Sequence, residues 1–235
     1  MIYVLILIAD LEKDNSIKDR SDILDIGALI LMGGKNTRMN GFVKGLLNIE
    51  GVTFLEKIIS NMGDFQNIYL SLNNKISYEN IPSIQNMNIT IVVDIYEEIG
   101  PIGGIYSALK QCKEEYLFVT ACDMPFIDKS FINYLKQYLK EDVDVVLCYD
   151  KENRIYPLGA IYSKKMLPMI EAMIKENNYK LAKLIYASNY ISVCIEDTPF
   201  SAEIFTNINT YEDYKKFIDN DLNIYNIYGK EIKHG

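Results

Sequence analysis

The chain has 235 residues, of which 49% are hydrophobic and 24% are charged, and its formal net charge at pH 7 is −8. This size and composition favour one fairly large globular domain with a substantial core. The acidic balance argues against binding to nucleic acid or to an anionic membrane, since both need a basic face. A small anionic ligand remains compatible with it, because a single loop can be positive on an acidic protein.

The chain begins with an apolar run at residues 2–9. No basic segment precedes this run, it lacks a small-residue cleavage site, and it is far too short to span a bilayer. We therefore expect a strand-like extension rather than a signal peptide. Residues 11–22 are polar and separate the run from the main domain. We treat residues 1–25 as an N-terminal extension of unassigned role.

From residue 26 onward, short apolar runs alternate with helix-like segments. Strands are predicted at 26–31, 67–72, 89–93, 116–121, 143–148, 158–162 and 191–195. Helices are predicted at 53–62, 102–112, 129–139, 164–176 and 180–187, and another is expected to begin at Thr210 with Asp213 completing a near capping box. This alternation predicts a three-layer, Rossmann-like α/β domain with a mostly parallel sheet over 26–220, followed by a tail at 221–235.

The loop after the first predicted strand is the most informative part of the chain. The strand stops at Gly33-Gly34, and the polar loop that comes next contains Arg38 before the chain reaches Lys44. A buried strand that opens into a glycine-rich, cationic loop presents N–H groups and positive charge to phosphates. Lys44 is followed by Gly45, which excludes a P-loop, and the single glycine pair does not match a dinucleotide fingerprint. The sequence therefore predicts a phosphate-binding loop that is neither a P-loop nor a dinucleotide-binding loop.

Polar residues also gather where the other predicted strands end. These are Ser71 with Asn73, then Asp94, then Asp123. Each alone is better explained as a cap, but four such strand ends in succession, counting Gly33-Gly34, favour a ligand site at the carboxyl edge of the sheet. Asp123 follows a long apolar run and precedes a proline, so it is well placed to hold a metal beside a nucleotide. The lone histidine, His234, lies near the C-terminus, which leaves carboxylates as ligands and favours Mg²⁺.

Two further features leave a functional and a structural interpretation open. Gly103 and Gly104 lie just inside a predicted helix, where each costs about 1 kcal/mol relative to alanine. Either a ligand or a packed strand approaches the backbone there. Asn207 and Asn209 share one face of an extended segment, where they either contact a ligand or satisfy turn backbone.

Together these blocks resemble the molybdenum cofactor guanylyltransferases, which are nucleotidyltransferases of the nucleotide-diphospho-sugar transferase fold. The matching blocks are Leu31-Met-Gly-Gly34, Arg38-Met-Asn-Gly41 followed by Lys44, Gly100-Pro-Ile-Gly-Gly104, Cys122-Asp-Met-Pro125 and Asn207-Ile-Asn209. The resemblance covers about residues 26–218. It implies the nucleotide-diphospho-sugar transferase fold for the predicted α/β domain.

The resemblance also implies roles for individual residues. Lys44, Arg38 and Asp123 would be catalytic, with Asp123 holding the magnesium. Leu31, Met32, Gly33 and Lys44 would bind the nucleotide, with Ser71 or Asn73 and Asp94 at the nucleoside. The residue patterns described above add Gly34, Gly103, Asn207 and Asn209 to the expected ligand-binding set. Within that set, the residues at 31–33 would contact guanine and phosphates, and Lys44 would bind the triphosphate.

Several positions depart from the family pattern. Met32 stands where alanine is usual, Asn40 replaces a glycine, and Val43 stands where an aspartate is frequent. Tyr156-Pro157 occupies a position where histidine-proline is common. A catalytically inactive nucleotide-binding module is therefore one alternative to an enzyme.

The reaction implied is transfer of GMP from GTP to the terminal phosphate of molybdopterin, with release of pyrophosphate and Mg²⁺ as cofactor. Alternatives in the same fold are a cytidylyltransferase and a nucleotidyltransferase acting on a sugar or alditol phosphate. The implied partners are GTP, molybdopterin and, transiently, other molybdenum cofactor biosynthesis proteins or target apoenzymes, with no nucleic acid or membrane. The four cysteines show no C-x-x-C spacing, so we expect reduced thiols and a cytoplasmic protein.

Overall fold

The computed structural model describes residues 25–32, 38–39, 42–43, 45, 48–49, 51–72, 89–208, 210 and 212–213. In this part of the chain, seven strands form one sheet in the order β11-β9-β10-β8-β1-β6-β7. The strands are β1 (Ile26–Leu31), β6 (Ile68–Leu72), β7 (Ile89–Val93), β8 (Tyr116–Ala121), β9 (Val145–Tyr149), β10 (Ile155–Ser163) and β11 (Tyr190–Cys194). All of them run in the same direction except β10, which is antiparallel to its neighbours β8 and β9. The expected mostly parallel sheet is confirmed.

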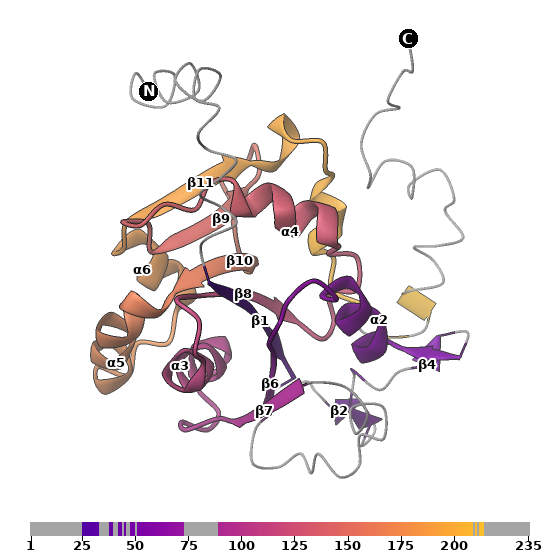
Figure 1. Ribbon diagram of the computed structural model, residues 1–235, viewed down its shortest axis with the longest axis horizontal. Helices are drawn as coiled ribbons and strands as arrows, with labels where there is room; N and C mark the ends of the chain where they lie inside the picture. Colours follow the sequence, from indigo (N-terminus) through magenta and orange to yellow (C-terminus); the bar gives the residue numbers. More distant parts are fainter. Residues whose placement is uncertain are drawn as a thin grey trace.

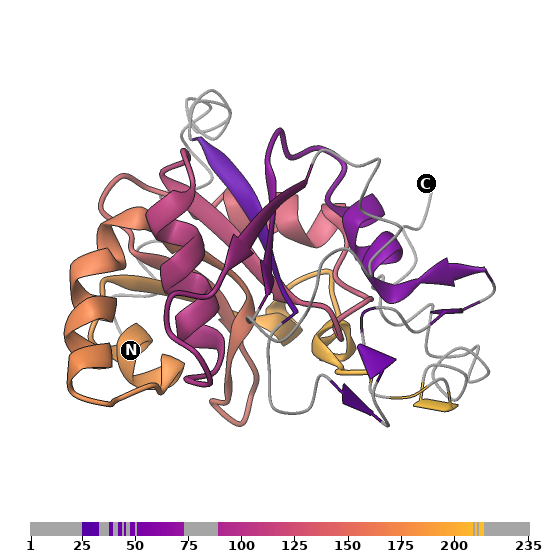
Figure 2. The same ribbon diagram turned by 90° about the horizontal axis from the view of Figure 1, so that it is seen from below.

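Helices cover both faces of this sheet (Figure 1). The helices α3 (Pro101–Gln111), α5 (Leu167–Lys175) and α6 (Leu181–Tyr186) pack on one face, and α2 (Phe54–Asn61) and α4 (Lys129–Lys136) pack on the other. Figure 2 shows α3 (magenta) and α5 (orange) side by side in one outer layer. Every residue of β1 after Ile26 is buried, which explains why this strand is a continuous apolar run rather than an alternating one. The three-layer prediction is confirmed.

Among the elements whose limits differ from the prediction, two do so for clear local reasons. The helix expected at 164–176 is a 3₁₀ turn (Lys164–Met166) followed by α5, which carries Pro168 in its first turn. Proline has no N–H to donate but fits the first turn of a helix, so the α-helix begins only at Leu167. Strand β10 is longer than the predicted 158–162, and its register with β9 shifts between Tyr156 and Ile161. Between these two pairs β10 advances by five residues and β9 by two, an irregularity that a pattern of apolar residues does not indicate.

The segment after β1 contains strand pairs that the sequence did not predict. β2 (Arg38–Met39) pairs with β3 (Phe42–Val43), and β4 (Asn48–Ile49) pairs with β5 (Val52–Thr53), both antiparallel. The polar stretch around Arg38 is therefore partly a short hairpin. Strands of two residues are too short for alternating hydrophobicity to show.

Two helix starts carry reciprocal caps, and the one at Thr210 was expected from the sequence. The Thr53 hydroxyl accepts a 3.1 Å bond from the Glu56 N–H, and the Glu56 carboxylate accepts a 2.7 Å bond from the Thr53 N–H. Thr210 and Asp213 make the same reciprocal pair, at 2.9 and 3.0 Å. Both are capping boxes, so the predicted helix start at Thr210 is confirmed. The N-terminal extension and the tail at 221–235 lie outside the described residues, apart from residue 25.

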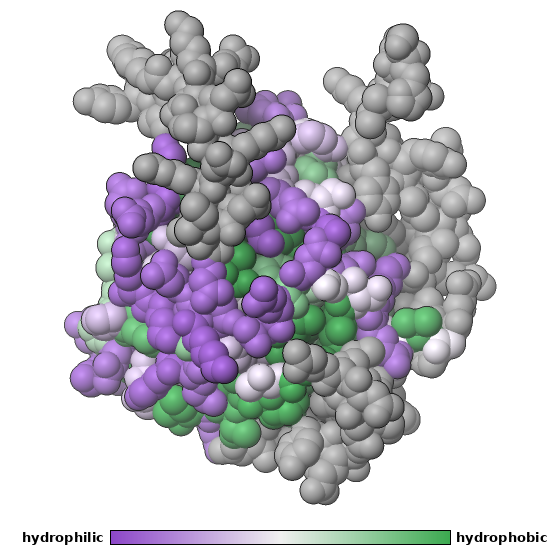
Figure 3. Space-filling view, in the orientation of Figure 1, coloured by the Kyte–Doolittle hydropathy of each residue, from purple (hydrophilic) through white to green (hydrophobic). Residues whose placement is uncertain are grey.

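The surface of the described residues is mixed. In the space-filling view, hydrophilic side chains cover much of one side of this face and hydrophobic ones show near its centre (Figure 3). The large hydrophobic side chains with the greatest exposure include Val93 at 48% and Ile95 at 47%, which flank Asp94. Over the described residues, no helix has both the length and the apolar character needed to cross a bilayer.

Candidate active site

The carboxyl ends of four neighbouring parallel strands meet at one edge of the sheet. Main-chain hydrogen bonds continue past the strands and lock these ends together: Met32 N–H donates to Ser71 O at 3.0 Å, and Cys122 N–H donates to Leu31 O at 3.0 Å. Ligands of parallel α/β sheets bind beyond this edge. The residues that follow the strands here therefore form the candidate site.

Ser71 and Asp94 meet at this edge. The Ser71 hydroxyl donates a 2.5 Å hydrogen bond to Asp94 Oδ1. Burial raises the pKa of the Asp94 carboxyl, and the bond from Ser71 offsets part of that effect. The pair presents one partly buried carboxylate between the exposed side chains of Val93 and Ile95.

The loop that carries Asp94 is held by a residue that the sequence argument missed. Ser107, on α3, is fully buried. Its hydroxyl accepts a 2.8 Å bond from the Ile95 N–H and donates a 2.7 Å bond to Gly103 O. The signal for this role in the sequence is a single serine in the mostly apolar first part of the helix.

The two helix glycines have a structural explanation. A Cβ atom on Gly104 would lie 2.5 Å from Ser71 Oγ and 2.7 Å from Leu31 Cδ2. A Cβ on Gly103 would lie 2.9 Å from Tyr96 O. Strand and loop atoms thus occupy the space a side chain would need, which favours close packing of α3 over a ligand as the reason for both glycines. Contact between Gly103 and a nucleotide stays a prediction.

Leu31 and Met32 direct their side chains into the core. Met32 is fully buried and Leu31 is 6% exposed, and they belong to the cores on opposite faces of the sheet. A Cβ atom on Gly45 would lie 3.1 Å from Met32 Cε and 3.7 Å from Leu55 Cβ. The methionine therefore fills space beneath the glycine. Contact of residues 31 and 32 with a ligand, which stays a prediction, would involve their main chain.

Asp123 and the Asn207 segment are brought together. Asp123 lies in the turn after β8, and its main-chain oxygen accepts a 2.7 Å hydrogen bond from the Ile208 N–H. Ile208 is buried, whereas its neighbour Asn207 is exposed. The predicted metal ligand and one predicted binding residue, distant in sequence, thus lie side by side in the fold.

Further along the edge, a network joins the β9–β10 turn. Asp150 Oδ2 accepts bonds from Arg154 Nε at 2.9 Å and from the Tyr156 hydroxyl at 3.1 Å, and it pairs with Arg154 Nη2 at 2.7 Å. Burial opposes ionisation of Asp150, but these donors outweigh it and lower the pKa of the carboxyl. Of these residues, only Tyr156 was noted from sequence. The signal for the others is a charged pair four residues apart between two apolar strands.

Several predicted site residues lie outside the described part of the chain. They are Gly33, Gly34, Lys44, Asn73 and Asn209, and for Arg38 only the backbone in β2 is described. Their roles stay predictions.

Comparison with known proteins identifies the family. The model of the MobA-like NTP transferase domain matches residues 28–191. The chain belongs to the MobA-like NTP transferase family. The match spans the strands and turns that carry Ser71, Asp94 and Asp123, and it confirms that the protein is a nucleotidyltransferase.

Individual members of the family support this. A probable molybdenum cofactor guanylyltransferase of Clostridium perfringens (strain 13 / Type A) is 36% identical over 198 residues, covering 81% of this chain and 95% of that protein. A molybdenum cofactor guanylyltransferase of Photobacterium profundum is 28% identical over 191 residues, covering 80% and 93%. The chain is thus similar to these enzymes over nearly their whole length.

Solved structures confirm the fold. A protein of Aquifex aeolicus VF5 superposes with a TM-score of 0.63 at 29% identity, covering 80% of this chain and 95% of that one. Molybdopterin-guanine dinucleotide biosynthesis protein A of Archaeoglobus fulgidus gives 0.67 at 23% identity, covering 81% and 95%. A 2-C-methyl-D-erythritol 4-phosphate cytidylyltransferase of Thermus thermophilus gives 0.60 at 12% identity, covering 86% and 100%, which shows that cytidylyltransferases share the fold.

The donor set at the edge suits a magnesium nucleotide. The described residues contain no group of three or more histidine, cysteine or acidic side chains placed to hold a metal. Asp123 nevertheless fits Mg²⁺, because this ion is commonly bound by one or two carboxylates together with waters and the phosphates of a substrate. Within a MobA-like NTP transferase, the nucleotide itself would complete the site.

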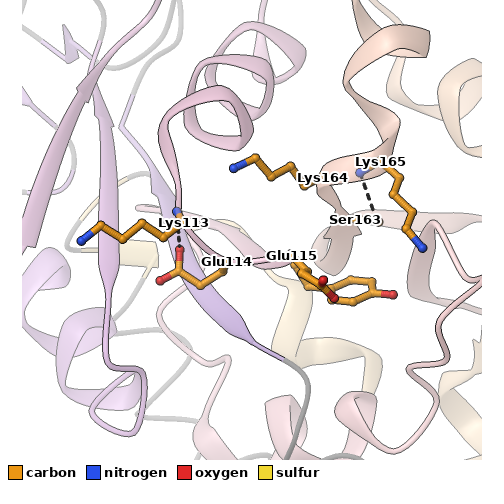
Figure 4. Close-up of a pocket in the computed structure, with 7 residues that line it drawn as sticks. Lys113, Glu114, Glu115, Ser163, Lys164 and Lys165 are labelled. Atoms are coloured by element: carbon orange, nitrogen blue, oxygen red, sulfur yellow. Dashed lines mark hydrogen bonds between the residues drawn. The ribbon is translucent and has the colours of Figure 1, made fainter.

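A cavity of about 310 Å³ lies at the opposite, amino edge of the sheet, lined by Lys113, Glu114, Glu115, Tyr116, Ser163, Lys164 and Lys165 (Figure 4). The side chains of Glu114, Lys164 and Lys165 are engaged within the protein. The buried Glu114 carboxylate accepts a 2.6 Å bond from Asn67 Nδ2 and a 2.8 Å bond from the Tyr69 hydroxyl. Burial, and next this bond from Tyr69 to Glu114, raise the pKa of Tyr69 to about 12. The arrangement ties β6 to the start of β8 and is structural.

Proposed function

We propose that this MobA-like NTP transferase transfers GMP from GTP to the terminal phosphate of molybdopterin in a Mg²⁺-dependent reaction. The names of its relatives support the substrates. The observation that carries the proposal is the position of Asp123. It lies between the Ser71–Asp94 pair on the β6–β7 side and the Asn207 segment on the β10 side.

The β6–β7 side is assigned to the nucleoside. Asp94 offers a fixed carboxylate for hydroxyl or amino donors, and the half-exposed Val93 and Ile95 beside it offer apolar area to a base. Asn207, on the other side of Asp123, is assigned to the acceptor together with Asn209. Gly33, Gly34, Arg38 and Lys44 are assigned to the phosphates, in agreement with a glycine-rich cationic loop.

The reaction needs positioning and charge neutralisation rather than a protein nucleophile. An oxygen of the acceptor phosphate attacks the α-phosphorus of GTP in line, the bond to the bridging oxygen breaks, and pyrophosphate leaves with the electron pair. The acceptor phosphate is already ionised near neutrality, so no general base is required. Magnesium held at Asp123 would neutralise charge on the phosphate oxygens. Lys44 and Arg38 add positive charge, and the Ser71–Asp94 pair and Asn207 fix the two substrates relative to each other.

The burial of Met32 bears on the inactive alternative. Its side chain is fully enclosed by core residues, so the change from the usual alanine is accommodated in the core rather than in a ligand pocket. This supports an active enzyme. The GTP-dependent reaction also agrees with a cytoplasmic protein and with transient contacts to other molybdenum cofactor biosynthesis proteins or target apoenzymes.

A panel of nucleotides and acceptors tests the proposal. Pyrophosphate release is measured with GTP, CTP, ATP and UTP, each with molybdopterin or a sugar phosphate and with Mg²⁺. Release confined to GTP plus molybdopterin is expected. Release with CTP, or with a sugar phosphate, would replace the proposal by the corresponding transferase. GTP binding without any release would support the nucleotide-binding module.

A further inference from the structure

We infer that Tyr156 is a positioning residue, which acts through Phe205 to hold the segment 206–208, and with it Asn207, beside Asp123. The position of the segment follows from contacts within the protein. The assignment of Asn207 to the acceptor rests on the proposed function.

The first contact is a stack of two aromatic rings. The rings of Tyr156 and Phe205 lie 4.1 Å apart between centroids with an angle of 11° between their planes. Phe205 also meets the ring of Phe131 on α4 edge-on, at 5.4 Å and 85°. Phe205 is thus held between β10 and α4 and has little freedom to turn.

The irregular part of β10 provides the space for Phe205. Gly159 has φ +73°, and a Cβ atom there would lie 2.8 Å from Phe205 Cε1 and 2.8 Å from Ile127 Cδ1. A side chain at this position would be strained and would also push the phenylalanine away. Phe205 therefore packs against the irregular part of β10, between Tyr156 and Ile161.

Tyr156 is itself fixed at its far end. Its hydroxyl donates to Asp150 Oδ2 at 3.1 Å, and the same carboxylate accepts Arg154 Nε at 2.9 Å. Asp150 Oδ1 accepts the main-chain N–H groups of Glu152 at 3.0 Å and Arg154 at 2.9 Å. The carboxylate is nearly buried and engaged by several donors. The ring that supports Phe205 is consequently tied to the whole β9–β10 turn.

The segment that follows Phe205 is fixed at its other end by Asp123. Ile208 is buried and its N–H donates to Asp123 O at 2.7 Å. Asn207 stands exposed between these two anchors. Loosening Phe205 would free one side of this segment, so Tyr156 influences the surroundings of Asp123 without touching a substrate.

Amide hydrogen exchange at Ile208 tests the positioning directly. Tyr156→Ala removes both the stack and the hydroxyl bond, and Phe205→Leu removes the stack by a milder change. Both should raise exchange at Ile208 by at least about tenfold while the amides of β1 are unchanged. Tyr116→Phe is the matched control, because it deletes a 3.0 Å bond from a buried tyrosine hydroxyl to Lys140 O at the opposite edge. Unchanged exchange at Ile208 in both variants, or an equal rise at all amides, would overturn the inference.

Kinetics tests the consequence for the reaction. Tyr156→Ala should raise the KM for the acceptor by at least about fivefold, since misplacing a binding group weakens positioning, while the KM for GTP stays within about twofold. Tyr156→Phe keeps the aromatic stack, so its KM for the acceptor should be close to that of the parent protein. Faster exchange at Ile208 with an unchanged KM for the acceptor would overturn the claim that the segment 206–208 serves acceptor binding. The claim that Tyr156 positions this segment would still be supported. If the unmodified protein releases no pyrophosphate with any acceptor, the proposed function fails, and the exchange result still decides the positioning.

Discussion

The Ser71 hydroxyl and the Asp94 carboxylate form a 2.5 Å hydrogen bond that joins the end of β6 to the loop after β7. Burial raises the pKa of Asp94 despite this bond. Folding therefore opposes ionisation of Asp94, which is the relation expected of a group that serves binding rather than stability.

Asp94→Asn should stabilise the protein at pH 7 and weaken catalysis. A carboxyl whose pKa rises on folding destabilises the folded state when it is ionised. The cost is absent below the pKa of the unfolded chain, about 3.9 for aspartate, and complete above the folded pKa. Urea unfolding should show a larger free energy of unfolding for the variant than for the parent protein at pH 7, and this difference should disappear as the pH falls to about 3. The value of kcat/KM for the nucleotide should fall about ten- to hundredfold. Lower stability at pH 7 would contradict the argument.

Asp123→Asn should reduce kcat by at least about 100-fold, the scale of losing one group that stabilises charge in the transition state. Ile208 bonds to the main-chain oxygen of Asp123, so the substitution leaves this anchor in place. Exchange at the Ile208 amide should stay as in the parent protein, which separates loss of a ligand from loss of structure. Rates within about threefold of the parent would refute the assignment.

Lys44→Ala should also lower turnover by at least about 100-fold, because it removes a positive charge assigned to the triphosphate. Lys35→Ala, in the same loop, provides a control of equal charge change and should have a small effect. The measurement is pyrophosphate release at saturating GTP. Equal losses in the two variants would indicate that only the total charge of the loop matters.

Gly104→Ala should destabilise the protein by about 1–3 kcal/mol, the usual cost of forcing extra atoms into a packed interior. The added methyl would meet Ser71 Oγ and Leu31 Cδ2 at 2.5 and 2.7 Å. Gln111→Ala, at an exposed position of the same helix, should change stability by less than about 0.5 kcal/mol. The two are compared by urea unfolding. A neutral Gly104→Ala would show that α3 can move away from the sheet.

The sequence predicted elements whose limits depend on local apolar runs. β1, β7 and β8 begin and end where predicted, because each is a short apolar run bounded by polar or turn residues. The carboxyl-edge rule also placed Ser71, Asp94 and Asp123 at one edge.

Contacts between distant segments were not predictable in this way. The bond from Ile208 to Asp123 involves only main-chain atoms, and the stack of Phe205 on Tyr156 depends on the irregular part of β10 around Gly159. Neither contact is indicated by a periodic pattern or a motif in the sequence. The Ser71–Asp94 bond lies between these cases: the sequence places both residues at the edge, but only the packing of β6 beside β7 brings them into contact.

The reversed direction of β10 divides the site into two halves of different construction. On the β1–β6–β7 side, each strand delivers its carboxyl end to the edge. On the β10 side, the edge receives the amino end of a strand and the turn that connects it to β9. A turn can lengthen, shorten or change its residues without altering the strand order. Under the proposed assignment, the scaffold could keep its nucleotide half constant while the half beside β10 changes, which would give nucleotidyltransferases of this fold a structural route to different acceptors.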